Sequence, residues 1–460
     1  MKSKASRIGG TLVLSFCILA LCGFLEYSFA FELLNGDLIV KGWAENFTAY
    51  MPSEIVGTDN ANLSNFRNTI QLETEYRINK QVKLYGIFKY FYEGAFDIDD
   101  GYVDRVKDDL EEPRSRDWLR EAYVDLNLGR LFIRIGKQQV VWGESDGLRL
   151  ADIINPLDLS SHYIFETWED IRIPNWMGRI IYSIPSAHQY NVELIVIPGH
   201  FDPTRMAPEG APWAFPGYAQ FIIDAMYDSV PHTSLENVQA GIRLGGNFGG
   251  ADIRLFNFYT RSQLPIFEPD WLARFGEGRT DLFSFKQEDV IGGSFNYFEN
   301  YTKAVYRGEI TFTIDHAFNR TDFTQVDKNV INYMLGIDRP TYFKFLNENS
   351  FFLSAQLFQM LILDHEDDLI SAYTGGHEDL TILTFLANTS YWHDRIVPQV
   401  FIAHEVNGSG WIQPQISYNP GDHWRFTLGG NYLYGHDPFG YFGLFGDSSE
   451  IFFRLRYYFM

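Results

Sequence analysis

Residues 66 to 78, FRNTIQLETEYRI, contain the pattern that decides the fold. Alternate positions from Phe66 onward form a mainly apolar set: Phe66, Asn68, Ile70, Leu72, Thr74, Tyr76 and Ile78. The positions between them form a polar and charged set: Arg67, Thr69, Gln71, Glu73, Glu75 and Arg77. Successive side chains of a β-strand point to opposite faces, so this segment predicts a long strand with one apolar and one charged face.

The same two-faced pattern recurs along most of the chain. It is clear at 306–314 and 424–434, and in the closing segment 451–459, where Arg454 and Arg456 lie between apolar residues. The predicted strands span 36–51, 62–79, 81–95, 116–128, 129–141, 175–185, 189–198, 236–247, 250–262, 287–299, 301–316, 327–338, 349–364, 379–392, 394–405, 410–419, 422–435 and 449–460. They number about 18, even as bacterial barrels require, with about 16 as the alternative if weak runs are merged.

The connections between these strands alternate in length. Every second one is short: 79–80, 128–130, 185–188, 249–250, 300, 393–394 and 420–421. The others are longer: 52–61, 96–115, 142–174, 199–235, 263–286, 317–326, 365–378 and 436–448. Two connections break the rule, because 338–348 is long and 405–408 is short. Short periplasmic turns opposite long outer loops are typical of outer-membrane barrels.

Composition supports the same class. After residue 30 no stretch approaches the roughly twenty apolar residues of a membrane helix, which leaves a secreted all-β protein or an outer-membrane barrel. Aromatic residues make up 17% of the chain and charged residues 21%, as expected when strands face lipid on one side and aromatic girdles mark both interfaces. We predict a transmembrane antiparallel β-barrel in the cell outer membrane, in contact with lipid and lipopolysaccharide. The net charge of −22 argues against nucleic acid as a partner.

Residues 1–30 are predicted to be a signal peptide. Three basic residues precede an apolar run from 11 to 24, and Ala30 ends a small-x-small cleavage site. Cys17 and Cys22 both lie inside it, so the mature domain, 31–460, would have no thiol. A lipoprotein anchored through Cys22 is the alternative that Leu21 disfavours, and an uncleaved anchor is disfavoured by the short apolar run.

The connection 142–174 is the unusual part of the chain. It is far longer than the usual two to six residues and rich in aromatic residues, which indicates a functional rather than a disordered loop. We predict that it folds into the lumen or over its mouth, with a turn at Asn155 and a short helix at 148–154. Its candidate site residues are Trp142, Glu144, Asp146, Arg149, Asp152, Asn155, Asp158 and Trp168. Its carboxylates would bond to wall arginines, and Trp142, Trp168, Tyr163 and Phe165 would offer solutes an apolar surface. A packed cap without selectivity is the alternative.

Three longer strings carry a resemblance: VVWGESDGLRLADIINPLDL (140–159), EDIRIPNWM (169–177) and LGIDRPTYFKFLNENSFFLSAQLF (335–358). In these the chain resembles a large family of Gram-negative outer-membrane proteins classed as a domain of unknown function, and the resemblance covers nearly the whole mature chain. It implies a porin-like barrel that is often encoded beside resistance-nodulation-division exporters and a periplasmic partner. It implies no particular substrate.

The wall of the predicted lumen is rich in arginine. Strand parity turns these residues inward: Arg67, Glu73, Arg77, Arg134, Arg179, Arg243, Arg307, Glu309, Arg454 and Arg456. They either pair with carboxylates and stiffen the wall, or form a constriction that favours anions. We therefore expect a channel for small hydrophobic or anionic solutes. The alternative is a non-conducting barrel that serves an exporter or surface complex.

Signals for catalysis or cofactors are weak. The sequence has no serine elbow and no two-histidine zinc helix, so we expect no enzyme and no cofactor, although a hydrolase at the rim stays as a third hypothesis. Acidic clusters at 97–112 and 365–368 are rich in possible cation ligands, yet neither has the spacing of a calcium loop. We interpret both as solvated outer loops and predict no metal site.

Overall fold

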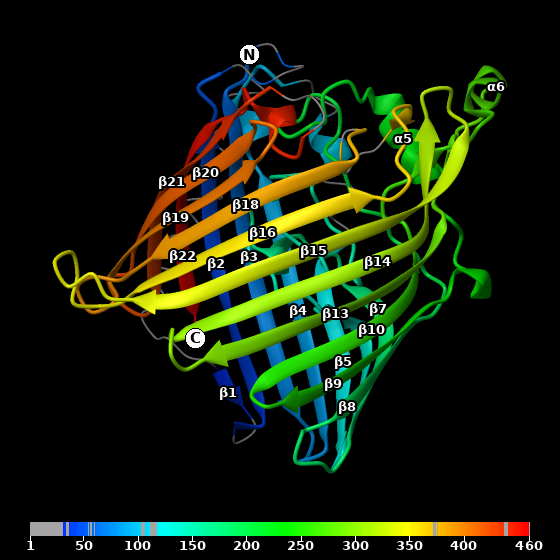
Figure 1. Cartoon of the computed structure of the whole chain (residues 1–460). Helices are drawn as coiled ribbons and strands as arrows, with labels where there is room; N and C mark the ends of the chain where they lie inside the picture. The colour runs from blue at the N-terminus through cyan, green and yellow to red at the C-terminus, as the bar shows by residue number, and fades with distance from the viewer. Residues whose placement is uncertain are drawn as a thin grey trace.

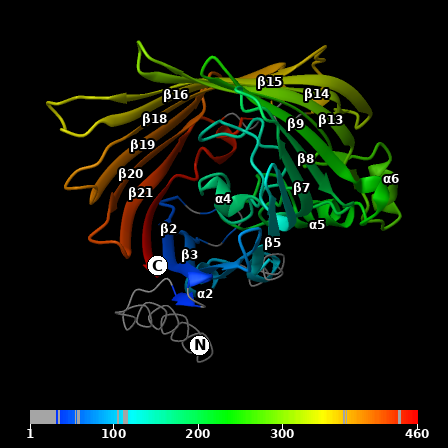
Figure 2. The ribbon, with the colours of Figure 1, turned by 90° about the horizontal axis from the view of Figure 1, so that it is seen from below.

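The computed structural model describes residues 31–33, 36–53, 55, 58, 60–102, 106–110, 117–370, 374, 376–436 and 440–459. The signal peptide predicted at 1–30 lies outside this described part of the chain. One sheet of 20 strands dominates the fold, and two of these strands, β1 (Phe31–Leu33) and β17 (Leu369–Ile370), are short additions beside β2 and β14. The other 18 strands form a closed antiparallel barrel (Figures 1 and 2).

The barrel strands are β2 (Leu38–Tyr50), β3 (Leu63–Arg77), β4 (Val82–Glu93), β5 (Leu119–Leu128), β6 (Leu131–Gln138), β7 (Asn175–Ser183), β8 (Asn191–Ile197), β9 (Gln239–Phe248), β10 (Ala251–Arg261), β13 (Gln287–Glu299), β14 (Ala304–Arg320), β15 (Gln325–Thr341), β16 (Phe351–Ile362), β18 (Asp379–Asn388), β19 (Ile396–Glu405), β20 (Gly410–Tyr418), β21 (Trp424–Tyr434) and β22 (Glu450–Phe459). Each pairs with its neighbour in sequence, and β22 pairs with β2 from Gly42↔Phe459 to Tyr50↔Ile451 to close the ring. Each of these strands overlaps one of the ranges predicted from alternation, so the predicted count of about 18 is confirmed.

The remaining elements lie in the connections. They are α2 (Ala95–Ile98), α4 (Trp168–Ile171), α5 (Gln220–Asp228), η2 (Leu235–Asn237), β11 (Ile266–Phe267), α6 (Trp271–Gly276), β12 (Phe283–Ser284) and η3 (Gly443–Phe445). β11 and β12 pair with each other, apart from the barrel sheet. None of the described helices is long and apolar enough to cross a membrane.

The two ends of the barrel differ as the connection lengths predicted, with one correction. The connection predicted as long at 317–326 is a turn of 321–324, because β14 and β15 extend to Arg320 and from Gln325. A register shift between Thr313 and His316 allows this extension, since a bulge keeps the pairing beyond a local mismatch. The long connection between β15 and β16 and the short one between β19 and β20 remain exceptions.

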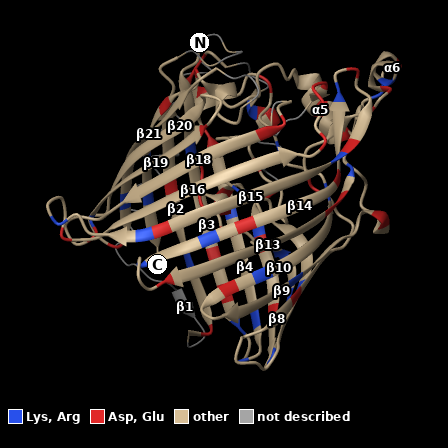
Figure 3. Ribbon diagram, in the orientation of Figure 1, with Lys and Arg blue, Asp and Glu red and all other residues tan. Residues whose placement is uncertain are grey.

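The faces of the strands have the inverted polarity of a membrane barrel. Outward positions carry large apolar side chains with no protein cover, such as Ile70 (39% exposed), Tyr90 (61%) and Leu335 (53%). Charged residues occur within the strands as well as at their ends (Figure 3), and Arg67 on β3 contacts a segment inside the barrel. In a soluble sandwich the apolar face would be the buried one. Here it is the exposed one, which fits a wall surrounded by acyl chains.

Candidate functional site

The connection between β6 and β7, residues 139–174, lies inside the barrel, and we call it the lumen segment. Viewed along the barrel, its helix α4 lies within the ring of strands (Figure 2). Asn155 joins its two ends: Asn155 Oδ1 accepts from Val140 N at 2.8 Å, and Asn155 Nδ2 donates to Ile173 O at 2.9 Å. The prediction that this connection folds into the lumen is confirmed.

The prediction of a short helix at 148–154 is wrong. The backbone amides of this stretch bond to the wall instead of forming a helical turn, since Ala151 N donates to Glu309 Oε2 at 2.9 Å. Gly147 precedes it with a φ of 79°, and a Cβ at this glycine would lie 2.5 Å from the Phe401 ring. One helical turn forms later, at Trp168–Ile171. A wall carboxylate that satisfies the amides of the segment is a long-range contact that local propensity does not reveal.

One side of the lumen segment is fixed to β10, β14 and β16. Glu309 accepts hydrogen bonds from the backbone of Glu144 and Ala151. Arg307 pairs with Asp146 of the segment and with Asp338 of the wall. Arg254 approaches Glu144 at 3.8 Å. The expected pairing of Glu144 and Asp146 with wall arginines is therefore present.

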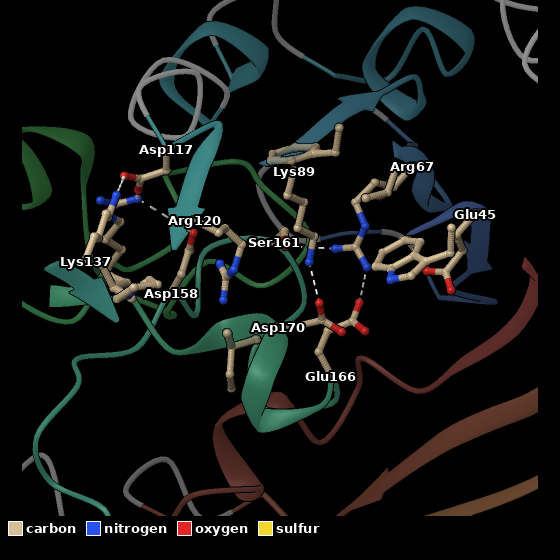
Figure 4. Close-up of a pocket in the computed structure, with 17 residues that line it drawn as sticks. Glu45, Arg67, Lys89, Asp117, Arg120, Lys137, Asp158, Ser161, Glu166 and Asp170 are labelled. Atoms are coloured by element: carbon tan, nitrogen blue, oxygen red, sulfur yellow. Dashed lines mark hydrogen bonds and ion pairs between the residues drawn. The ribbon is translucent and has the colours of Figure 1, made fainter. Parts of the chain in front are cut away.

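The opposite side is fixed to β3, β4 and β22. Glu166 pairs with both Arg67 and Arg454, the latter at 2.8 Å, and Asp170 pairs with Lys89 (Figure 4). Burial alone would raise the pKa of Glu166, but the two guanidinium groups outweigh it and hold this pKa well below its usual range. The segment is thus attached to both halves of the wall by charge-assisted hydrogen bonds.

A buried histidine completes this attachment. His162 Nε2 lies 2.5 Å from Glu450 Oε1, and His162 Nδ1 lies 3.2 Å from Glu166 Oε1. Burial opposes protonation of His162, but Glu450 and Glu166 raise its pKa above the ordinary histidine value. Neither His162 nor Glu450 was among the residues predicted for the site, because nothing in the alternation indicates which loop residue meets which strand.

Two expectations for the lumen segment fail. Asp152 pairs with Arg172 at 2.6 Å and with Arg149 at 3.0 Å, both inside the segment, rather than with the wall. Asp158 lies 4.0 Å from Arg205, which belongs to the connection between β8 and β9. Asp152 therefore stabilises the conformation of the lumen segment itself, and Asp158 lies near an arginine of another connection. Neither carboxylate pairs with an arginine of a barrel strand.

The aromatic residues of the segment are packed rather than offered to solutes. Trp142 is buried against Phe256 and Phe258 of β10, with the Arg243 guanidinium 5.4 Å from its ring. Phe165 stacks edge-on against Trp213 and Trp411, and Tyr163 contacts Phe445. Trp168 is partly buried at the edge of the same cluster, with Arg149 6.0 Å away. The expected apolar surface for solutes is therefore an internal core.

Each of the other predicted wall residues pairs with an oppositely charged side chain outside the predicted set. The ion pairs are Arg134 with Asp125 (2.6 Å), Arg179 and Arg243 with Glu193 (2.7 and 2.5 Å), Arg77 with Glu75 (2.7 Å), Arg456 with Glu45 (2.6 Å) and Glu73 with Lys41 (3.2 Å). Each of these arginines has a carboxylate within hydrogen-bond distance.

The predicted acidic clusters pair with bases. Asp97 pairs with Lys107, and Glu366 with Arg320 and Lys328. Within the described ranges, no group of three or more histidine, aspartate or glutamate side chains is arranged to hold a metal ion. Residues 103–105 and 111–116 of the first cluster lie outside the described residues.

Sequence reasoning missed a pocket between the lumen segment and β2 to β6, about 70 Å³ in volume. It is lined by Arg120, Lys137, Asp117 and Arg205 together with Arg67 and Glu166 (Figure 4). A wider cavity of about 520 Å³ lies below it, among Glu75, Arg77, Lys83, Asp125 and Arg134 at the ends of β3 to β6. Both of these spaces border β3 to β6.

The barrel resembles solved porins. It is similar to Salmonella typhi OmpF in complex with daunomycin (10% identity, 93% of this chain and 99% of that chain, TM-score 0.43). It is also similar to Pseudomonas aeruginosa OccK2 in complex with glucuronate (10% identity, 92% of this chain and 97% of that chain, TM-score 0.48). A third similar structure is Acinetobacter baumannii OccAB3 (8% identity, 92% of this chain and 99% of that chain, TM-score 0.48). A comparison with curated proteins finds no match.

The family prediction can be checked directly. The family model DUF1302, described as a protein of unknown function, matches residues 42–459. This range runs from β2 to β22 and includes the whole lumen segment. The chain therefore belongs to the DUF1302 family, which agrees with the resemblance that the sequence strings 140–159, 169–177 and 335–358 indicated.

Proposed function

We propose that this chain is a channel of the outer membrane for small hydrophobic or anionic solutes, and that the lumen segment limits its bore. The observation that carries the proposal is a closed barrel with an apolar exterior and a segment held across its interior by ion pairs. A barrel of about eighteen strands encloses enough space for an aqueous channel unless something fills it. The lumen segment contacts β10 and β14 on one side of the barrel, and two cavities border β3 to β6 on the other.

The proposed route follows the inner face of β3 to β6. The wide cavity near the short turns and the smaller pocket beside α4 both border these strands. Most charged side chains along the route are paired, as Arg134 is with Asp125. Paired charges lower the field of the wall, so selectivity depends on groups that are not neutralised.

Deletion of residues 145–172 tests this proposal. In planar bilayers the purified deletion variant should conduct more than the full chain, because removal of the segment opens the part of the lumen that it fills. A variant lacking residues 343–349 in the turn between β15 and β16 serves as the control, since this turn lies outside the lumen segment and should leave conductance unchanged. Equal conductance of the full chain and the 145–172 deletion would show that the segment does not limit the bore.

A non-conducting barrel that serves an exporter or a surface complex, with a periplasmic protein among its candidate partners, is the second proposal. The burial of Trp142, Phe165 and Trp213 favours it, because these side chains form a packed core that blocks part of the lumen. A barrel that stays silent in bilayers both before and after the deletion supports docking over transport. Neither proposal assigns the chain an enzymatic activity, a cofactor or a metal.

A further inference from the structure

The pocket beside α4 contains an arginine whose direction the alternation does not predict. In β4 and β5, Ile87 pairs with Glu121 and Phe88 pairs with Leu119, so Arg120 is the extra residue of a β-bulge. A bulge re-aims one side chain relative to the alternating pattern, and bulges are frequent next to binding sites. Here the bulge brings Arg120 to the lumen segment, between the Lys89–Asp170 pair and Asp117 (Figure 4).

Arg120 differs from the other cations that line this pocket. Arg67 pairs with Glu166, Lys89 with Asp170, and both Lys137 (3.1 Å) and Arg205 (2.6 Å) with Asp117. Arg120 instead donates through Nη2 to two backbone carbonyls, Glu169 O at 2.6 Å and Arg172 O at 2.8 Å. Among the residues that the structure describes, no carboxylate lies within ion-pair distance of it.

The remaining donors of Arg120 can reach a solute. Its Nε and Nη1 atoms have no hydrogen-bond partner in the described part of the chain, and they are not among the polar atoms that are sealed from solvent. A guanidinium keeps its charge at any physiological pH and binds carboxylates through charge-assisted hydrogen bonds. The carboxylates around it are already shared, since Glu166 serves both Arg67 and Arg454. Five acidic and five basic side chains line the pocket, so the free donors of Arg120, rather than a surplus of positive charge, are what the site offers to an anion.

The lining and the volume of the pocket also limit the size and the polarity of the anion that it can hold. Trp43, Phe91, Ile171, Ile173 and Pro174 supply an apolar lining. Its volume is about 70 Å³. A water molecule needs roughly 10 to 15 Å³ on this scale, so the space corresponds to about five waters. A solute of about six non-hydrogen atoms fits without movement of the lumen segment.

We propose that this pocket is a binding site for short-chain monocarboxylates, with the carboxylate on Nε and Nη1 of Arg120 and the alkyl chain against Trp43, Phe91 and Ile171. This inference rests on the proposed channel function, because it names the class of solute that the channel takes. It explains why Arg120 is turned inward by a bulge yet left without a carboxylate partner. Butyrate, which has six non-hydrogen atoms, is the matching probe.

Calorimetric titration of the detergent-solubilised full chain tests the site without any need for conductance. Butyrate should bind saturably, whereas butyramide, which has the same size and no charge, and butylamine should bind at least about tenfold more weakly, since a hydrogen bond to a charged group is worth roughly that factor or more. R120Q should lose the preference for butyrate over butyramide, and R120K, which keeps the charge, should retain part of it. R425Q is the matched control, because Arg425 on β21 is not part of the pocket.

The preference ratio separates recognition from structure. Arg120 also holds the backbone of α4 through Glu169 O and Arg172 O, so R120Q also loosens the segment, but loosening alone changes the affinities for butyrate and butyramide together. Equal affinities of the unmodified chain for butyrate and butyramide, absence of saturable butyrate binding, or an unchanged ratio in R120Q would each overturn the site. Butyrate binding by a barrel that does not conduct would reject the channel and keep the site, and conductance without butyrate binding would do the reverse.

Discussion

Removal of the Glu166 carboxylate should release one side of the lumen segment. Glu166 is buried (3% of its side chain is exposed) and pairs with Arg67 and Arg454, whose side chains are 12% and 17% exposed. E166Q keeps the shape of the side chain but leaves the largely buried Arg67 without its paired carboxylate, and it leaves Arg454 with the 3.9 Å contact to Glu45. Breaking a buried pair in this way typically costs about 3 to 5 kcal/mol. The equilibrium between the attached and detached segment should therefore shift by roughly 10² to 4 × 10³-fold toward detachment.

Hydrogen–deuterium exchange measures this shift directly, because exchange of protected amides follows the opening equilibrium. Peptides from the lumen segment should exchange faster in E166Q, while peptides from β15 should be unchanged and show that the barrel is intact. E73Q is the matched control, since Glu73 pairs with the half-exposed Lys41 and a surface pair is worth about 0 to 1 kcal/mol. Equal exchange of the segment in E166Q, E73Q and the unmodified chain would refute the claim that Glu166 holds it.

Three further outcomes follow from the same contacts. The low pKa of Glu166 makes its contribution complete above about pH 4.3 and lost as pH falls through the folded value, and the raised pKa of His162 makes its contribution complete below about pH 6.5 and lost as pH rises. Protection of the segment, taken relative to the intrinsic exchange rate at each pH, should thus be greatest near about pH 5 to 6. N155A leaves Val140 N and Ile173 O without the Asn155 partner at a cost of about 1 to 3 kcal/mol, so exchange should rise first at the Val140 amide, which loses its acceptor. R454A/R456A removes two positive charges from the lumen wall and should move the reversal potential toward cation preference, which a bi-ionic bilayer measurement detects.

The alternation of side chains predicts the barrel well because it acts at every strand. Residues 66–78 show why: one face must meet acyl chains and the other an enclosed interior, so each position carries the same information. The parity of β3 and β22 placed Arg67 and Arg454 inward, where the structure has them paired with Glu166. The length and aromatic content of 142–174 predicted a segment folded into the lumen or over its mouth, and the structure shows which of the two it is.

The contacts that close the site were not predictable in the same way. Alternation did not predict that Arg120 points toward the lumen segment, because a bulge interrupts the alternation of side chains in β5. The helix expected at 148–154 gave way to hydrogen bonds with Glu309, which is more than 150 residues away in sequence. Asp152 pairs with Arg149 and Arg172 of its own segment instead of with an arginine of the wall. Each case depends on a partner from a distant segment, which composition and spacing do not specify.

The central claim is that the exposed apolar face of the barrel meets lipid and the charged face meets water. Spin labels on single cysteines introduced at Leu72 and Glu73, adjacent positions of β3, test it in reconstituted vesicles. The label at Leu72, whose side chain is 39% exposed, should collide with oxygen dissolved in the acyl chains, and the label at Glu73 with a water-soluble nickel complex. A label at Leu72 that reports water, or one at Glu73 that reports lipid, would contradict the fold and everything proposed from it.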